Sequence, residues 1–283
     1  MRKIGVVGCG LMGSGIAEVC AKQGLDVIVV ERSVEALEAG QKRIQISLER
    51  AVTNGKLERD AADAAWASLR FEASLEALSD RDLVIEAVAE DEYIKTAVFT
   101  ELDRIVTNPE AIFTTNTSSI PIIKLAMATQ RPQQVIGMHF FNPVPVLKLV
   151  EMIPSLLSSS ETSARIRAFA EEQLGKHVIV SPDRAGFVVN ALLIPYLLSA
   201  VRMLESGFAS AEDIDTGMVL GCAHPMGPLR LIDLIGVDTT VAIADSLYSE
   251  FKEQNFTAPP LLSRMSQAGL LGRKTGQGFY SYR

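Results

Sequence analysis

The feature that most constrains this chain is a run of glycines that follows its first apolar segment. Residues 3–8 read KIGVVG, a β-branched run typical of a parallel strand that is buried on both faces. The spacing G-x-G-x-x-G comes next and opens a helical stretch. In such a turn the glycines allow a tight bend, close approach of backbone amides to a pyrophosphate, and close helix–strand packing. The pattern predicts a dinucleotide-binding βαβ unit in which the phosphates meet Gly8, Gly10, Leu11, Met12 and Gly13.

The end of the second predicted strand indicates which dinucleotide binds. The segment DVIVVE (26–31) ends in Glu31, eighteen residues after Gly13. An acid there hydrogen-bonds the adenosine ribose hydroxyls and repels a 2′-phosphate, so NAD is the expected cofactor. Arg32 follows directly and could pair with a 2′-phosphate, so NADP stays open. The alternative interpretation is a flexible glycine turn beside a surface glutamate.

The order of apolar runs predicts an α/β fold with a second, helical domain. Further strands are expected at residues 69–73, 82–88, 111–117, 134–140, 147–153 and 176–181. Strands that alternate with helices imply a Rossmann-type, doubly wound, mostly parallel sheet. Ser33 is the expected N-cap of a long polar helix that runs to about Leu57, an excursion from the sheet. After about Asp183 only helical spacing is found, which predicts an NAD-binding domain at 1–184 and an all-α domain at 185–283.

Composition excludes several classes of function. A net charge of −7 and a pI near 5.2 argue against a nucleic-acid-binding surface. The three cysteines show no metal-ligand spacing, so no metal site is expected, and their odd number fits a reducing compartment. The chain begins with a strand-like segment and not with a targeting peptide, which favours the cytoplasm. Its most apolar segment, 187–201, is shorter than a membrane span, so a buried helix is predicted.

One histidine lies where chemistry is expected. His139 ends an apolar strand within GMHFFNPVPVLKLVE (137–151), and open α/β sheets bind ligands beyond the carboxyl ends of their strands. Oxidising an alcohol by hydride transfer needs a base, and histidine titrates near neutral pH. Glu151 could fix the tautomer and stabilise the imidazolium if the turn NPVPV folds its strand back beside His139. A core histidine is otherwise more often structural, although a buried ionisable pair is costly unless the two groups satisfy each other.

Several segments together resemble the 3-hydroxyacyl-CoA dehydrogenases. They are GCGLMGSGIA, NTSS (116–119), HFFNPVPVLKLVE (139–151), GFVVNALLIPYL (186–197), HPMGPLRLIDLIGVDT and GRKTGQGFYSY, and the resemblance covers essentially the whole chain. It implies reversible, NAD-dependent oxidation of (S)-3-hydroxyacyl-CoA, with a short chain of the 3-hydroxybutyryl type. It also implies an acyl-CoA substrate as the small-molecule partner and, from the long apolar helix, a homodimer.

The resemblance also implies residue roles. His139 would be the general base, Glu151 its orienting partner, and Ser118 and Asn190 would hydrogen-bond the substrate oxygens. Further contacts to the cofactor are expected from Glu90, Lys95, Asn116, Asn142 and Lys274, and contacts to coenzyme A from Ser47, Arg50 and Lys56. Outside this pattern, Ser118 would be interpreted as a helix cap, Asn190 as a residue bonded to helix backbone, and Lys95 as a solvated helix charge.

One departure keeps other functions open. The stretch SLERAVTNGKLE has Thr53 and Asn54 where the family commonly carries lysine, which weakens the expected contacts to coenzyme A phosphates. A dehydrogenase of a free hydroxyacid or a sugar acid on the same scaffold is therefore an alternative. A non-catalytic NAD-binding protein is a second, and an enzyme with a catalytic lysine a third. The intact run from His139 to Glu151 argues against both of these.

Overall fold

The apolar segments of the N-terminal part pair into one eight-stranded sheet, as predicted. The computed structural model describes residues 1–282. The strands are β1 (Lys3–Val7), β2 (Asp26–Val30), β3 (Leu69–Glu72), β4 (Leu83–Glu86), β5 (Ile112–Thr115), β6 (Val135–Phe140), β7 (Leu149–Pro154) and β8 (His177–Val180). Their order is β3-β2-β1-β4-β5-β6-β7-β8, and every pair is parallel except β6 with β7. The chain reverses its direction of winding between β1 and β4, which is where open α/β sheets bind ligands.

Helices cover both faces of this sheet. They are α1 (Leu11–Lys22), α2 (Val34–Thr53), α3 (Arg59–Ala67), α4 (Glu92–Ile105), α5 (Ile122–Ala126) and α6 (Ser160–Ala168), with short turns η1 (Leu75–Leu78), η2 (Pro132–Gln134) and η3 (Phe169–Gln173). One core unites α1 and α6 with alternate strand residues such as Ile4, Val6 and Val27. Residues of the opposite face pack against α4, where the rings of Phe99 and Phe113 meet edge to face. Successive side chains of a strand point to opposite faces of the sheet, so each strand contributes apolar side chains to both cores.

The glycine turn joins β1 to α1 in a backbone shape that side chains would block. Gly8 has φ +95°, a left-handed conformation that favours glycine. A Cβ on Gly13 would collide with the carbonyl oxygen of Gly8, so α1 can begin this close to the strand only with glycine there. At Gly10 nothing lies within 4 Å of the Cβ position, so the turn leaves open space on that side. Gly8 and Gly13 are therefore required by the backbone geometry of this turn.

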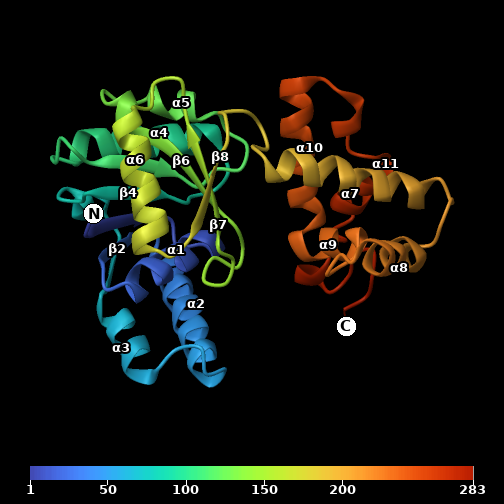
Figure 1. Ribbon diagram of the computed structural model, residues 1–283, viewed down its shortest axis with the longest axis horizontal. Helices are drawn as coiled ribbons and strands as arrows, with labels where there is room; N and C mark the ends of the chain where they lie inside the picture. Colours follow the sequence, from blue (N-terminus) through green and yellow to red (C-terminus); the bar gives the residue numbers. More distant parts are fainter. Residues whose placement is uncertain (283) are drawn as a thin grey trace. The chain divides into compact units, whose positions relative to one another are not determined.

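The polar excursion after β2 is two helices and not one. Ser33 caps α2 as predicted, since its hydroxyl accepts a hydrogen bond from the Ala36 amide at 3.2 Å. The helix ends at Thr53 and not near Leu57, because the chain turns at Gly55, which has φ +65°. The shorter helix α3 follows, and Figure 1 shows both helices extending away from the sheet.

The antiparallel pair of β6 and β7 carries the histidine and the glutamate. The segment NPVPV lies between the two strands, and the chain turns back there, as considered from the sequence. The register pairs His139 directly with Glu151. Residues that oppose each other in an antiparallel pair have their side chains on the same face. The twelve-residue separation in sequence thus becomes direct adjacency.

The remaining residues form a separate helical unit, which divides from the first between Arg184 and Ala185. It contains α7 (Val189–Glu205), α8 (Ala211–Cys222), α9 (Pro228–Ile235), α10 (Val237–Phe251) and α11 (Pro260–Gln267), with short turns η4 (Gln254–Phe256) and η5 (Arg273–Thr275). Its core is apolar, and the segment predicted as a buried helix forms α7, which buries only one face and leaves Leu192 exposed. Within residues 1–282 no helix has the length and apolar character needed to cross a membrane.

The amino-terminal edge of the sheet carries a buried arginine whose ion pairs predict an acid dependence of stability. Arg81 is 1% exposed and binds Asp80 at 2.6 Å and Asp26 at 3.1 Å. Hydrogen bonding from Lys3 and then from Arg81 lowers the pKa of Asp80 to about 2, against the opposing effect of burial. A lowered carboxyl pKa adds stability that is present above the unfolded value and lost as the pH falls through the folded value.

We therefore expect Asp80→Asn to lower the free energy of unfolding at neutral pH by less than about 1 kcal/mol, because the side chain is half exposed. The difference from the wild type should shrink between pH 4 and pH 2, measured by urea unfolding across that range. Asp60→Asn, at an exposed carboxylate of α3, is the control. A difference that persisted unchanged at pH 2 would show that the Asp80 charge is not its source.

Candidate functional site

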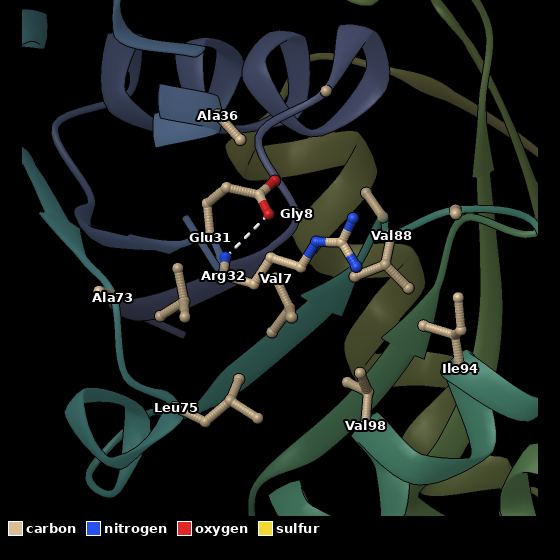
Figure 2. Close-up of a pocket in the computed structure, with 14 residues that line it drawn as sticks. Val7, Gly8, Glu31, Arg32, Ala36, Ala73, Leu75, Val88, Ile94 and Val98 are labelled. Atoms are coloured by element: carbon tan, nitrogen blue, oxygen red, sulfur yellow. Dashed lines mark hydrogen bonds between the residues drawn. The ribbon is translucent and has the colours of Figure 1, made fainter. Parts of the chain in front are cut away.

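A cavity of about 590 Å³ lies at the winding reversal of the sheet. The ends of β1, β2 and β4 supply its floor, and the glycine turn borders it. Its lining residues include Val7, Gly8, Gly10, Val30, Glu31, Arg32, Ala73, Leu75, Val88, Ile94 and Val98, most of which appear in Figure 2. The walls are mainly apolar, with two charged side chains at one end. Such a lining suits a flat aromatic group joined to a polar sugar.

The two charged residues of this cavity take different positions. One carboxylate oxygen of Glu31 accepts a hydrogen bond from the Cys9 amide in the glycine turn at 3.0 Å. Its other oxygen accepts from the Arg32 amide at 2.8 Å, the bond drawn in Figure 2. Burial, and then the Glu31 charge, raise the pKa of the Cys9 thiol to about 11, so this thiol stays protonated. Glu31 therefore supports the turn as well as facing the cavity.

These residues fit the expected NAD. The open space beside Gly10 leaves room for a pyrophosphate against the first turn of α1, where Leu11 and Met12 follow. Glu31 lies at the end of β2, where it can accept hydrogen bonds from ribose hydroxyls. Arg32 lines the same cavity, so a cation lies near the position that the 2′-phosphate of NADP would take.

His139 and Glu151 form a buried, hydrogen-bonded pair at the carboxyl end of β6. The Nδ1 atom of His139 lies 2.7 Å from a carboxylate oxygen of Glu151. Glu151 is 0% exposed and His139 is 7% exposed. The ring of Phe141 lies beside the imidazole, with centroids 4.7 Å apart. The contact with Glu151 thus fixes the orientation of the imidazole ring.

The loop after β5 lies next to this pair. Asn116 accepts a hydrogen bond from the Phe140 amide at 2.8 Å, which ties the loop to the residue that follows His139. Ser118 directs its amide and its hydroxyl to one oxygen of Glu90, at 2.9 and 3.3 Å. Ser118 does not cap α5, since the amides of Ile122 and Ile123 donate to Asp183 instead.

One carboxylate oxygen of Glu90 accepts the hydrogen bonds that residues 117–119 donate. The same oxygen accepts from the hydroxyl of Thr117 and from the amide and hydroxyl of Ser119. Its second oxygen lies 3.3 Å from the ammonium of Lys95. Burial alone would raise the pKa of Glu90, but the Lys95 charge and these donors hold it below the usual range. Glu90 is therefore a carboxylate at neutral pH.

Lys95 is not a solvated helix charge. It is 1% exposed, and its ammonium lies 2.7 Å from the carboxylate of Glu86, at the end of β4. Sequence reasoning missed Glu86, which sits inside a run of apolar strand residues and is itself 0% exposed. The signal was present, because a carboxylate in a strand that is buried on both faces needs an internal partner.

A second hollow lies between α1, α2 and the proline turn. Ser47 and Arg50 line it with Asn142 and Leu11, which brings four of the sequence-predicted residues together. Lys56 does not line it, because α2 ends three residues earlier and Lys56 lies exposed in the following turn. Arg43, which sequence reasoning missed, also lines this hollow and donates to the Cys9 carbonyl at 2.9 Å. Its position seven residues before Arg50, on one face of α2, is the pattern that could have indicated it.

Two predicted residues belong to the helical unit. Asn190 lies in the first turn of α7 and is 8% exposed. Lys274 lies in η5, where its ammonium is 2.6 Å from both carboxylate oxygens of Asp238. In residues 1–282 no group of three or more acidic, histidine or cysteine side chains is arranged to hold a metal ion.

Comparison with known proteins identifies relatives over the full chain. Residues 3–184 match the family model "3-hydroxyacyl-CoA dehydrogenase, NAD binding domain", and residues 186–282 match "3-hydroxyacyl-CoA dehydrogenase, C-terminal domain". A 3-hydroxybutyryl-CoA dehydrogenase of Mycobacterium tuberculosis is 56% identical, covering 100% of this chain and 99% of the relative.

Solved structures agree with this family. The crystal structure of FadB2 from M. tuberculosis has a TM-score of 0.99 at 55% identity, covering 100% of this chain and 99% of that one. The structure of (S)-3-hydroxybutyryl-CoA dehydrogenase PaaH1 from Ralstonia eutropha has a TM-score of 0.94 at 44% identity, with the same coverage.

The position of Glu31 predicts a measurable cofactor preference. Glu31→Gln removes the charge and keeps an oxygen that can accept from the Cys9 amide. We expect the Kd for NADH to rise by about tenfold, since hydrogen bonds to a charged group weaken, while the Kd for NADPH falls or stays constant. Fluorescence titration with each cofactor measures both constants.

The exposed Glu35→Gln in the first turn of α2 serves as the control for this measurement. If both constants rose in the same proportion, Glu31 would act through the glycine turn alone and not on the ribose.

Proposed function

Because the chain belongs to the 3-hydroxyacyl-CoA dehydrogenase family, we propose that it catalyses the reversible oxidation of (S)-3-hydroxyacyl-CoA to 3-ketoacyl-CoA with NAD. The observation that supports this most is the buried pair of His139 and Glu151, at the same edge of the sheet as the cofactor cavity. The names of the relatives favour a short acyl chain, with 3-hydroxybutyryl-CoA as the substrate.

In the proposed reaction His139 moves the proton. The Nε2 atom of His139 would accept the proton of the substrate hydroxyl, and NAD held at the glycine turn and Glu31 would supply the acceptor for the hydride that leaves the same carbon. Glu151, on Nδ1, holds the ring in the required tautomer and stabilises the imidazolium that forms. In the reverse direction the imidazolium returns the proton to the carbonyl oxygen. The burial of both side chains keeps this pair in one orientation.

The substrate oxygens need donors beside this pair. Ser118 is the candidate on the loop after β5, and Asn190 is the candidate on α7. The Ser118 hydroxyl lies 3.3 Å from the Glu90 carboxylate, so donating to a substrate oxygen requires this hydroxyl to rotate. Positioning and charge stabilisation of this kind can supply several kcal/mol of the barrier reduction.

The coenzyme A end is proposed to lie along α2. Arg43, Ser47 and Arg50 line one hollow there, which gives two guanidinium groups for phosphates in a chain of net charge −7. Thr53 and Asn54 at the end of the helix supply no such charge, and this favours the second candidate, a dehydrogenase of free hydroxyacids or sugar acids.

The helical unit is proposed to form a homodimer. Large apolar side chains are exposed on it, including Leu192 of α7 at 73%, Phe208 at 79% and Leu220 of α8 at 80%. Exposed apolar groups of this size favour association with another protein surface.

The three cysteines are free thiols, which supports a reducing compartment such as the cytoplasm.

The proton-transfer role predicts a loss of turnover with little loss of cofactor binding. His139→Ala should lower kcat for NADH-dependent reduction of acetoacetyl-CoA by about 100- to 10 000-fold, since the group that gives the proton to the carbonyl oxygen is removed. Glu151→Gln should also lower kcat, because the imidazolium loses its counter-charge. Stopped-flow turnover and NADH titration measure the two effects separately.

His177→Ala, at the exposed start of β8, is the matched control and should keep wild-type turnover. Wild-type kcat in either His139→Ala or Glu151→Gln would remove the assignment of this pair as the catalytic base.

Substrate class can be tested on the unmodified protein. NADH oxidation should be rapid with acetoacetyl-CoA and at least about 100-fold slower with free acetoacetate. Only the thioester carries coenzyme A, whose contacts with the protein supply binding energy. Repeating the assay with NADPH tests the cofactor preference. Turnover of a free acid but not of the thioester would select the second candidate, and NADH binding without any turnover would indicate a non-catalytic protein.

A further inference from the structure

Glu86 is a buried carboxylate that no step of the proposed reaction uses. It is the last residue of β4, beside the winding reversal of the sheet, and it is 0% exposed. The three residues before it in the strand are apolar and buried. Placing a charge there is costly unless the surrounding groups satisfy it fully. The cost suggests that the position serves something besides packing.

Both oxygens of Glu86 are occupied by donors from different elements. Oε1 accepts from the Lys95 ammonium at 2.7 Å and from the Val88 amide at 2.6 Å. Oε2 accepts from the Thr115 hydroxyl at 2.6 Å. The carboxylate thus joins the end of β4, the helix α4 and the end of β5. None of these partners is a solvent-exposed side chain, since Lys95 and Thr115 are also buried.

Each partner leads to one of two loops beside the candidate site. Lys95 lies 3.3 Å from Glu90, which receives the donors of residues 117–119. The Thr115 hydroxyl, which donates to Glu86, accepts in turn from the Thr117 amide at 3.2 Å. Ser118 is therefore fixed from two sides, and both routes begin at the same carboxylate.

We propose that Glu86 is a positioning residue of the hydride-transfer site, acting through Lys95 and Thr115 on the loop that carries Ser118. This inference rests on the proposed function, because Ser118 is taken there as a donor to the substrate. The proposal assigns no proton transfer to Glu86, which is 0% exposed. It holds the loop because hydrogen bonds to a charged group are stronger than neutral ones and because a shared network orders its members together.

The arrangement of charges favours this role over simple neutralisation of Lys95. One ammonium lies within 3.3 Å of two carboxylates, so Glu90 already supplies a counter-ion. Glu86 adds a second negative charge, and it adds the links to Thr115 and to the Val88 amide. Those links order backbone on both sides of the site, which a counter-ion alone would not require.

Two variants test the proposal by separate routes. Glu86→Gln keeps the shape and removes the charge. Thr115→Val removes only the hydroxyl link and leaves the ion pair with Lys95 intact. We expect kcat for acetoacetyl-CoA to fall by about 10- to 100-fold in Glu86→Gln and by a smaller factor in Thr115→Val, because misplacement of a positioned group slows the chemical step. Turnover is expressed per NADH-binding site, so that unfolded protein does not enter the value.

The control is Glu92→Gln, on an exposed carboxylate of α4 that pairs with Lys124 at 2.7 Å. It should keep wild-type kcat. The Kd for NADH should stay within about twofold in Thr115→Val and Glu92→Gln, which keep the ion pair of Glu86 with Lys95, a division between binding and turnover that a general loss of structure would not produce. Wild-type kcat per site in both Glu86→Gln and Thr115→Val would overturn the proposal.

A second readout does not depend on turnover. The amides of Ser118, Ser119 and Ile120 donate to Glu90 or to Thr117, so their hydrogen exchange reports the order of the loop. In the free protein we expect exchange there to be faster in Glu86→Gln and in Thr115→Val, by about tenfold or more, with no change in β1.

The two readouts separate the inference from the function it rests on. A wild-type protein that does not reduce acetoacetyl-CoA would contradict the proposed function, and the exchange measurement would still decide the role of Glu86. Unchanged exchange at these amides in Thr115→Val would contradict the inference even if Glu86→Gln failed to fold.

Discussion

Parallel strands end at one edge of their sheet, and this constraint places nearly every polar group of the candidate site. Glu31 follows β2, Glu86 ends β4, and Asn116 follows β5. The sheet is otherwise apolar on both faces, so polar side chains can gather only where the strands stop. The reversal of winding between β1 and β4 opens this edge, and the cavity forms there.

The antiparallel strand β7 is the exception that completes the site. A parallel strand would begin at the opposite edge of the sheet and would place its third residue far from the end of β6. Because β7 returns directly, Glu151 opposes His139 and the two side chains share one face. Removing both ionisable groups from water is tolerable because each satisfies the other. The same geometry that makes the pair stable orients the imidazole for the proposed proton transfer.

Buried charge is used repeatedly in this unit, with different consequences. At the amino-terminal edge Arg81 binds half-exposed carboxylates, and the result is a contribution to stability that depends on pH. At the carboxyl edge Lys95 and Glu86 are almost fully enclosed, and their bonds lead to the two loops that border the site. Because their surroundings differ, the ion pairs of Arg81 contribute to stability, whereas the pair of Lys95 with Glu86 is proposed to position the loop that carries Ser118.

The sequence by itself determined the class of the fold and the nature of the cofactor site, because glycine spacing and apolar runs act locally. Gly8 and Gly13 meet steric requirements of a single turn, and β-branched runs report burial on both faces. Ser33 as a helix cap is equally local. Only the tertiary structure decided which distant groups meet. The end of α2 before Lys56, the burial of Lys95 and the partnership of Glu86 with Thr115 depend on neighbouring elements. A charged residue carries no local sign of whether solvent or a buried partner will satisfy it.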